Sequence, residues 1–460
     1  MDIKKNQVCE VEILDNGFKG EGIAKIDGFT VFVPNAIKGE KVQIKILKVL
    51  SSHAFAKIEK ILEESKDRRD DDCETYAKCG GCVMRHIDYK ATLEMKRNSV
   101  VSTLKKQGLE DVTVMGTIGM ENPLYYRNKL QYPLSKDADG KPVMGVFAER
   151  THRVVSTKHC YIQDERLQNI ANGIFEFIKE NGIPVYDEST LSGQIRHLVL
   201  RVGVKTDEVM VVIVSNEKKI TKERELVQYI VDNFSNVKTV VKNINMKDTN
   251  VILGRENVVL FGDGYIYDEL LGFKFKISPM SFYQVNPYQT EKLYSKVIEY
   301  AELSGDETVF DLYCGIGTIG ICASKNVRKL YGIETVPEAI EDAKRNAKEN
   351  GIQSAEFFVG DVEKALPEFI KERGISPDVV FVDPPRKGCD KTAIETILRI
   401  EPKRIVYVSC NPATLARDLK LLEEKYDVKE ITPVDMFPFT GHVECVSMLT
   451  LKNADNIGIN

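Results

Sequence analysis

The sequence predicts an α/β fold with a parallel sheet in its C-terminal part, preceded by an α+β region and a small β-barrel. Strand-like runs and turn glycines fill the N-terminal region, and further strand-like runs recur between residues 125 and 275. From about residue 290 onward, strands such as VFDLY, KLYGIE and DVVFVD alternate with helical segments. Such alternation is typical of a parallel sheet with helices on both faces.

Length and composition set the first limits. The 460 residues suffice for about three domains, which we place at 1–62, 63–275 and 276–460. With 43% hydrophobic and 29% charged residues the composition is that of a globular protein, and the net charge of −5 excludes a chain that is basic throughout. We find no apolar run near the ~20 residues that span a bilayer and no export segment at the start. We therefore expect a cytoplasmic monomer with no membrane partner, whose ten cysteines serve packing, metal binding or catalysis.

The N-terminal region predicts a barrel. QVCEVEILD, FTVFVPN and EKVQIKILKVL are strand-like, and the glycines between them mark tight turns. Five short strands in this region suit a barrel of the OB type, which often binds oligonucleotides. Lys19 and Lys25 are candidate phosphate contacts, although solvated lysines are at least as good an interpretation. The charge run EESKDRRDDD is expected to be a solvated linker.

The middle region combines helix, mainly antiparallel strands and a group of cysteines. Residues 89–107 predict a helix, and HLVLRVGV, EVMVVIVSN and FKFKIS predict strands. Three closely spaced thiols and a distant fourth can bind an iron–sulfur cluster or zinc, and the spacing leaves both open. In YYRNKLQY, Arg127 and Lys129 are candidate nucleic-acid contacts, with an edge strand carrying solvated charges as an equal alternative. The four cysteines are Cys73, Cys79, Cys82 and Cys160.

A glycine-rich turn in the C-terminal region predicts a cofactor site. VFDLYCGIGTIG ends a strand and opens a helix, and its Gly315 and Gly317 permit a tight turn against which a ligand can lie. Glu334 closes the next strand, where a carboxylate can bind ribose hydroxyls. NAD and S-adenosylmethionine both fit this pattern, and the glycines alone do not choose between them.

Three further carboxylates favour S-adenosylmethionine. Asp311 precedes the glycines and could hold an ammonium group, and Asp361 ends the next strand-like run, FFVGD, where it could accept from an adenine amino group. Asp383 stands before two prolines in VDPPRKG, which force a rigid turn at the ligand-binding edge of the sheet. A methyltransferase can use that turn to place Asp383 beside cofactor and target base, whereas a dehydrogenase does not need it.

Cys410 and Glu444 are the candidate nucleophile and base. Cys410 in VYVSCNPATLARDL ends a strand at the same edge, just before a helix whose positive end favours a thiolate; packing is the alternative. A thiolate that adds to C6 of uracil makes C5 nucleophilic toward a sulfonium methyl, and a base must then remove the C5 proton. Glu444 lies in the otherwise apolar stretch VECVSMLTL and is the favoured base, with His442 the weaker choice.

The motifs SFYQVN, DLYCGIGTIG, DPPRKG, SCNP and GHVE together, in this order, resemble the RNA uracil-5 methyltransferases. The resemblance implies a Rossmann-like class I methyltransferase domain in which Cys410 is the covalent nucleophile and Glu444 the base. It places Phe282 near the target base, and Tyr283 stands where many members carry a second Phe. The cofactor contacts that it implies come from Gln284, Tyr313, Glu334 and Asp383.

The same resemblance implies a TRAM domain in the N-terminal barrel and a [4Fe-4S] cluster on the four cysteines. Barrel and cysteines together favour a uridine in 23S ribosomal RNA as the substrate, with the tRNA T-loop as the alternative. The target base is expected to flip out of the RNA, because C6 is inaccessible within a stack. An NAD-dependent oxidoreductase and a non-catalytic RNA-binding scaffold are more distant alternatives.

Overall fold

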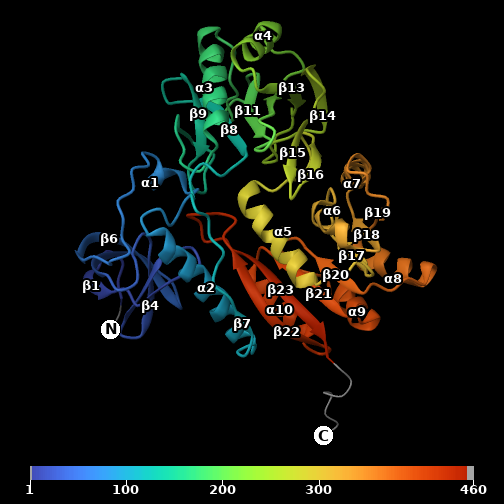
Figure 1. The fold of residues 1–460 in the computed structure, drawn as a ribbon. Helices are drawn as coiled ribbons and strands as arrows, with labels where there is room; N and C mark the ends of the chain where they lie inside the picture. The colour runs from blue at the N-terminus through green and yellow to red at the C-terminus, as the bar shows by residue number, and fades with distance from the viewer. Residues whose placement is uncertain (1–2, 453–460) are drawn as a thin grey trace. The chain divides into compact units, whose positions relative to one another are not determined.

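The computed structural model describes residues 3–452 (Figure 1). These residues form two compact units. The first unit comprises residues up to 76, residues 80–121 and residues from 384 onward, and the second comprises residues 77–79 and 122–383. None of the described helices is long and apolar enough to cross a membrane.

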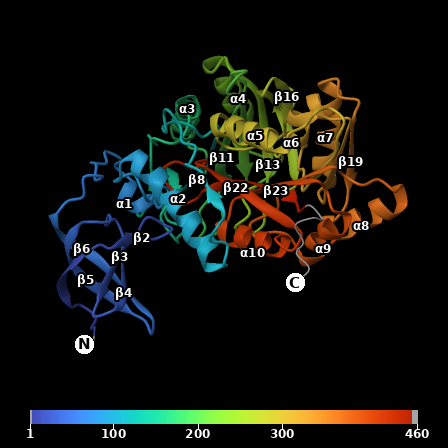
Figure 2. The same ribbon diagram turned by 60° about the horizontal axis from the view of Figure 1, so that its bottom comes forward.

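The N-terminal strands of the first unit form a barrel-like, six-stranded sheet around an apolar core that includes Ile13, Val31 and Ile44 (Figure 2). The barrel prediction is confirmed, with six strands where the sequence suggested five. Burial alternates along the first part of β5, so every second residue there faces the core, as expected for a strand with one buried face. In spatial order the strands are β1 (Val8–Glu12), β5 (Lys41–Val49), β6 (His53–Glu63), β4 (Phe29–Val33), β3 (Gly22–Ile26) and β2 (Asp15–Asn16).

The charge run at residues 63–72 is only partly the solvated linker that its composition indicates: five of its ten residues are exposed, and others bind buried partners. The Nε atom of Arg68 lies 2.5 Å from Oε1 of the fully buried Glu40. Asp71 likewise accepts a 2.8 Å hydrogen bond from the buried Arg85. A buried charge is tolerated when it is paired, so these contacts fix the segment to its surroundings.

The rest of the first unit contains further strands and helices. β23 (Glu444–Leu451) runs antiparallel to both β21 (Arg404–Ser409) and β22 (Tyr426–Val434), and β7 (Thr113–Val114) adds to β22 in parallel. The Asp88 side chain caps α2 (Tyr89–Lys106) by accepting from two backbone amides. The other helices are α9 (Lys391–Ile400) and α10 (Pro412–Leu422), and the short α1 (Tyr76–Cys79) lies where the chain passes between the units.

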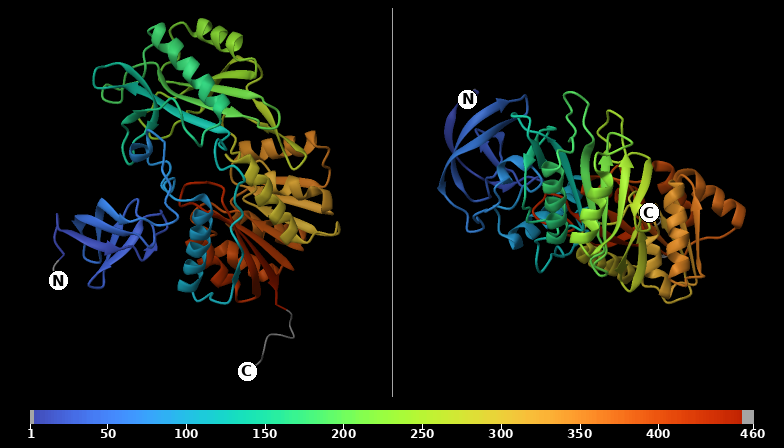
Figure 3. Two further views of the ribbon diagram at one scale, coloured as in Figure 1. Left: turned by 60° about the vertical axis from the view of Figure 1, so that its left-hand side comes forward. Right: turned by 90° about the horizontal axis from the view of Figure 1, so that it is seen from above.

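The middle part of the second unit is a seven-stranded sheet whose helices α3 (Glu165–Glu180) and α4 (Glu223–Asn233) share one apolar core with it (Figure 3). Every strand pair is antiparallel except β12–β13, so the predicted α+β region is confirmed with one parallel pair. In spatial order the strands are β10 (Val154–Ser156), β9 (Pro142–Phe147), β8 (Lys129–Lys136), β11 (Ile195–Val202), β12 (Val209–Ser215), β13 (Val237–Ile244) and β14 (Glu256–Phe261).

The second unit also contains the predicted parallel α/β sheet. Its strands follow the order β19 (Ala355–Val359), β18 (Lys329–Glu334), β17 (Thr308–Leu312) and β20 (Val379–Val382), all parallel. The strands β17 and β20 are buried along their whole length, which explains their continuous apolar runs. Around them lie α5 (Pro287–Ala301), α6 (Thr318–Ala323), the 3₁₀ turn η1 (Ser324–Asn326), α7 (Pro337–Glu349), α8 (Val362–Arg373) and the hairpin β15 (Ile266–Leu270)–β16 (Phe273–Ile277).

Candidate active site

The glycine turn follows β17 in the second unit. Tyr313, Gly315 and Gly317 all adopt left-handed backbone conformations, with φ of 63°, 55° and 80°. The two glycines adopt them freely, whereas Tyr313 is strained, as residues at ligand sites often are. A Cβ on Gly317 would lie 3.1 Å from Phe357 and Ile321, so the turn is also tightly packed.

Glu334 at the end of β18 is fixed beside this turn. Its Oε2 accepts a 3.2 Å hydrogen bond from the Gly315 amide, and its Oε1 accepts a 2.9 Å bond from the Val336 amide. The carboxylate is half-buried and is held by backbone donors at the end of its strand. It is therefore placed as a ribose-binding carboxylate would be in this fold.

Two acidic groups near the turn have unusual protonation. Asp311 is fully buried, and its Oδ2 accepts a 2.9 Å bond from the Gly320 amide. Burial raises the pKa of Asp311 to about 7, and the nearby Asp383 and Glu334 add to that effect. Burial also raises the pKa of Asp383, which is partly exposed, to about 7.

These acids fit a cationic ligand. Within residues 3–452 the Oδ1 atom of Asp311 is buried without a hydrogen-bond partner, which is rare and indicates a missing donor. S-adenosylmethionine carries a sulfonium and an ammonium group, either of which would offset the cost of ionising such carboxyls. The acidic groups beside the glycine turn therefore fit this cofactor.

The loop SFYQVN lies in the second unit before α5. Phe282 is 72% exposed, which is unusual for a large ring in a loop, and Gln284 is half-buried. Asn128, which the sequence analysis did not single out, holds the loop: its amide donates to the Val285 carbonyl (2.9 Å) and its Nδ2 to the Gln284 carbonyl (3.1 Å). The signal available in the sequence was an asparagine between two cationic residues, Arg127 and Lys129. Asp361 stands exposed at the start of α8, where its side chain makes no capping bond.

Cys410 and Glu444 meet in the first unit through strand register. In the antiparallel pair β21–β23, Ser409 lies opposite Cys445, so the next position outward on each strand is Cys410 and Glu444. Such opposed positions have Cα atoms roughly 4.5–5.5 Å apart. Cys410 is half-buried and Glu444 only 6% exposed, whereas His442 is exposed. The predicted nucleophile and base are thus neighbours.

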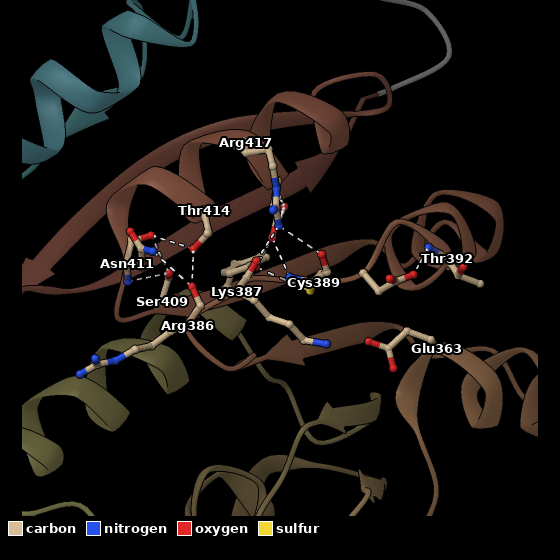
Figure 4. Close-up of polar contacts among 12 residues, drawn as sticks. Glu363, Arg386, Lys387, Cys389, Thr392, Ser409, Asn411, Thr414 and Arg417 are labelled. Atoms are coloured by element: carbon tan, nitrogen blue, oxygen red, sulfur yellow. Dashed lines mark hydrogen bonds and ion pairs between the residues drawn. The ribbon is translucent and has the colours of Figure 1, made fainter. Parts of the chain in front are cut away.

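The turn that carries Cys410 is fastened to the loop after the two prolines (Figure 4). Asn411 caps α10 by accepting from the Ala413 amide at 3.1 Å, and its Nδ2 donates to the Arg386 carbonyl at 3.2 Å. Thr414 Oγ1 donates to the same carbonyl at 3.4 Å. The Asn-Pro pair therefore both starts the helix and ties it to the neighbouring loop.

A second tie lies one turn further along α10. The fully buried Asp418 accepts a 2.8 Å bond from the Cys389 amide and a 2.6 Å bond from the Tyr407 hydroxyl. Arg417 Nη2 donates to the carbonyls of Lys387 (3.0 Å) and Cys389 (3.2 Å) (Figure 4). Cys389 is buried.

The four-cysteine set gives no completed metal centre. Cys73 and Cys82 both lie near the Arg85 guanidinium in the first unit, and Cys79 and Cys160 both lie near Tyr132 in the second. Among the described residues, however, no three His, Cys, Asp or Glu side chains are arranged to hold a metal ion. The cluster therefore stays a prediction, and no catalytic step is derived through it.

Comparison with known families shows to which family the chain is similar. The model of the tRNA (uracil-5-)-methyltransferase family matches residues 88–452, and the model of the TRAM domain matches residues 3–58. The chain belongs to the tRNA (uracil-5-)-methyltransferase family. As a member it is an RNA methyltransferase that depends on S-adenosylmethionine, so the resemblance seen in the five motifs and the predicted TRAM domain are confirmed, and the NAD-dependent alternative is set aside.

Similar proteins support this assignment over almost the whole chain. An uncharacterized RNA methyltransferase of Clostridium acetobutylicum is 49% identical over 97% of this chain and 98% of its own. One of Staphylococcus aureus is 44% identical over 98% and 99%. The crystal structure of the Pyrococcus abyssi tRNA (uracil-54, C5)-methyltransferase with S-adenosyl-L-homocysteine superposes with a TM-score of 0.77, 28% identity, and coverage of 96% and 100%. The Rossmann-like methyltransferase fold predicted for the C-terminal region is thereby confirmed.

Proposed function

We propose that this chain methylates C5 of a uridine in RNA with Cys410 as covalent nucleophile and Glu444 as base. The observation that carries the proposal is the register of β21 and β23, which brings these two residues to adjoining positions. The chemistry needs both at one pyrimidine ring, because one attacks C6 and the other acts on the adjacent carbon.

The residues act in sequence. The Cys410 thiolate adds to C6 of the flipped uracil, and the electron pair of the C5–C6 bond moves toward C5 and the O4 enolate. S-adenosylmethionine supplies the electrophilic methyl group that C5 captures. Glu444 then takes the C5 proton, the C5–C6 double bond re-forms, and the electron pair of the C6–sulfur bond returns to Cys410 as a thiolate. The N-terminus of α10 favours the Cys410 thiolate both before it adds to C6 and after it is released.

The remaining predicted contacts belong to the same proposal. Glu334 would bind the ribose hydroxyls, Asp361 the adenine amino group, and Asp383 the reacting end of the cofactor, where its turn faces the target base. The exposed ring of Phe282 would stack on that base. Further cofactor contacts are proposed for Gln284, Tyr313, Gly315 and Gly317.

A fluorinated substrate tests the mechanism. RNA containing 5-fluorouridine should form a covalent adduct with the wild-type chain that survives denaturing electrophoresis, because fluorine cannot leave as a cation. Cys410→Ala should abolish the adduct, while Cys9→Ala, the same change in the barrel, should keep it. Glu444→Gln should accumulate an adduct with ordinary RNA, since an amide cannot accept the C5 proton. A wild type without adduct, or an adduct in Cys410→Ala, would contradict the mechanism.

We infer that the substrate is 23S ribosomal RNA. The combination of a TRAM barrel with the four cysteines supports this choice. The similarity to the Pyrococcus abyssi enzyme, whose name specifies uracil 54 of tRNA, favours the tRNA T-loop as the second candidate. Mapping 5-methyluridine in total RNA with and without the gene separates them: loss at a 23S position supports the first, and loss confined to the T-loop supports the second.

We also propose that the four cysteines hold a [4Fe-4S] cluster with a structural role. The position of Cys73 and Cys82 near the same Arg85 guanidinium supports a shared site for that pair. Anaerobic purification followed by iron and sulfide assays tests the proposal. Equal iron and sulfide supports it, and a colourless protein with one zinc ion replaces it with the alternative that the spacing left open.

A further inference from the structure

Three cationic side chains lie near the SFYQVN loop in the second unit. In the antiparallel pair β8–β11, Lys129 lies directly opposite Arg201. Arg127 comes two positions before Lys129 and is close enough to repel its charge. Strand β9 pairs with β8 only at residues 134–136, so at Lys129 the strand pairs with β11 alone, and Arg127 and Lys129 are half-buried there.

This arrangement is costly for the protein by itself. Like charges directly opposite one another destabilise a sheet. Arg201 is only 7% exposed and Lys129 is half-buried, yet in the described part of the chain no acidic side chain pairs with either of them or with Arg127. Burial, together with the charges of Arg201 and Arg127, lowers the pKa of Lys129 to about 8.

One donor of Arg201 is satisfied and another is not. Its Nη2 donates a 2.8 Å hydrogen bond to the Ser281 carbonyl at the start of the loop. Its Nε is buried without a partner within residues 3–452. A buried guanidinium with an unused donor, facing two more cations, is expected to receive an anion with several acceptor oxygens.

The cluster is joined to the loop expected to meet the target base. Arg201 holds Ser281, and Asn128, between the other two cations, holds Gln284 and Val285 by the bonds described above. The exposed Phe282 lies within that loop. An anion bound by the cluster therefore fixes its position relative to Phe282.

We propose that Arg127, Lys129 and Arg201 bind a backbone phosphate of the RNA beside the flipped uridine. This inference rests on the proposed function, because it assumes that Phe282 meets the target base. Arginine presents a planar fork of donors that matches phosphate oxygens, and lysine adds a point charge. A nucleotide flipped from the stack has a phosphate on each side, so a fixed phosphate site next to Phe282 would orient it.

Salt-dependent RNA binding tests the site. The variants are Lys129→Met and Arg127→Gln, and the matched control is Lys136→Met at the exposed end of the same strand. With a 23S ribosomal RNA transcript, each site variant should weaken binding about tenfold at low salt and reduce the slope of log Kd against log salt by about 1. The control should resemble the wild type.

Two further measurements keep the result interpretable. The Tm of the ligand-free Lys129→Met protein should equal or exceed that of the wild type, since a repelled cation is removed; a lower Tm together with unchanged RNA binding would make the role structural and overturn the proposal. Weaker S-adenosylmethionine binding with unchanged RNA binding would assign the cluster to the cofactor carboxylate and also overturn it. At saturating 5-fluorouridine RNA, Lys129→Met should still form the Cys410 adduct, so failure of the chemistry is distinguishable from failure of the phosphate site.

Discussion

Replacing Lys96 by methionine is expected to destabilise the segment that leads to the catalytic base. Lys96 lies on α2, and its Nζ is 2.5 Å from Oδ1 of Asp435 and 3.1 Å from the Phe437 carbonyl. The two charged side chains are only 1% and 0% exposed. Asp435 is the first residue after β22, and the chain from there leads to Glu444 at the start of β23.

The magnitude follows from the carboxylate left behind. Removing one partner of a buried ion pair costs about 3–5 kcal/mol, because the other charge stays buried and uncompensated. The Tyr89 hydroxyl still donates to Oδ2 of Asp435 at 2.9 Å, a bond to a charged group that offsets part of the loss. We therefore expect a loss at the low end, about 3 kcal/mol, against a total stability of roughly 5–15 kcal/mol.

Denaturant unfolding of the full chain measures this loss, and a double variant isolates its cause. Lys96→Met with Asp435→Asn should recover most of the stability, since a neutral amide replaces the uncompensated charge. The surviving Lys96→Met protein should also accumulate covalent adduct with ordinary RNA, because a displaced Glu444 removes the C5 proton slowly. A single variant that loses less than about 1 kcal/mol, or a double variant no better than the single, would refute the reasoning from burial.

Four other outcomes follow from the second unit. S-adenosylmethionine affinity, measured by calorimetry, should rise as pH increases through about 7, because Asp311 and Asp383 must lose their protons to face a cation; Asp383→Asn should flatten the profile. In the ligand-free protein the same raised pKa values make the free energy of unfolding decrease as pH rises from about 4 to about 7, because in that range only the unfolded chain has released these protons. Gly317→Ala should lower Tm and cofactor affinity, because its φ of 80° and its packed surroundings both oppose a Cβ. Gly351→Ala should lower Tm less, because its φ is 70° but the space around it is open. RNA affinity should fall as pH rises above about 8, where Lys129, repelled by Arg127 and Arg201, loses its charge, and Lys129→Met should show no such step.

The sequence was sufficient for the features that depend on position within a strand or turn. Gly315 and Cys410 had to follow strands at the ligand edge, because parallel strands place their carboxyl ends together. Glu444, at the start of the antiparallel β23, was assigned from its chemistry and its apolar surroundings. The pairing of Cys410 with Glu444 was inferred from chemistry, and the register of β21 and β23 supplies the spatial reason.

The sequence alone could not predict features that depend on the register between distant segments. Lys129 and Arg201 become neighbours only when β8 and β11 pair, and a slip of one residue would separate them. Part of the run at residues 63–72 was misjudged for a related reason. Its charges looked solvated by composition, but the buried Glu40 and Arg85 need partners, and only the fold shows which charges supply them.

The two catalytic residues are supported in different ways. Cys410 depends on local ties between α10 and the loop after the two prolines. The chain before Glu444 depends instead on N-terminal elements of the first unit: the amides of Val83 and Met84 both donate to the Phe439 carbonyl, and the Phe439 ring lies 5.3 Å from the Arg85 guanidinium.

The barrel supports the same chain. Gly441 packs so closely on it that a Cβ would collide with the Phe18 carbonyl oxygen, so the glycine of the GHVE motif is required by contact. The N-terminal region therefore has a second consequence besides RNA binding. It fixes the segment that presents the base, so damage there should affect proton removal before it affects the thiolate addition, which has its own local support.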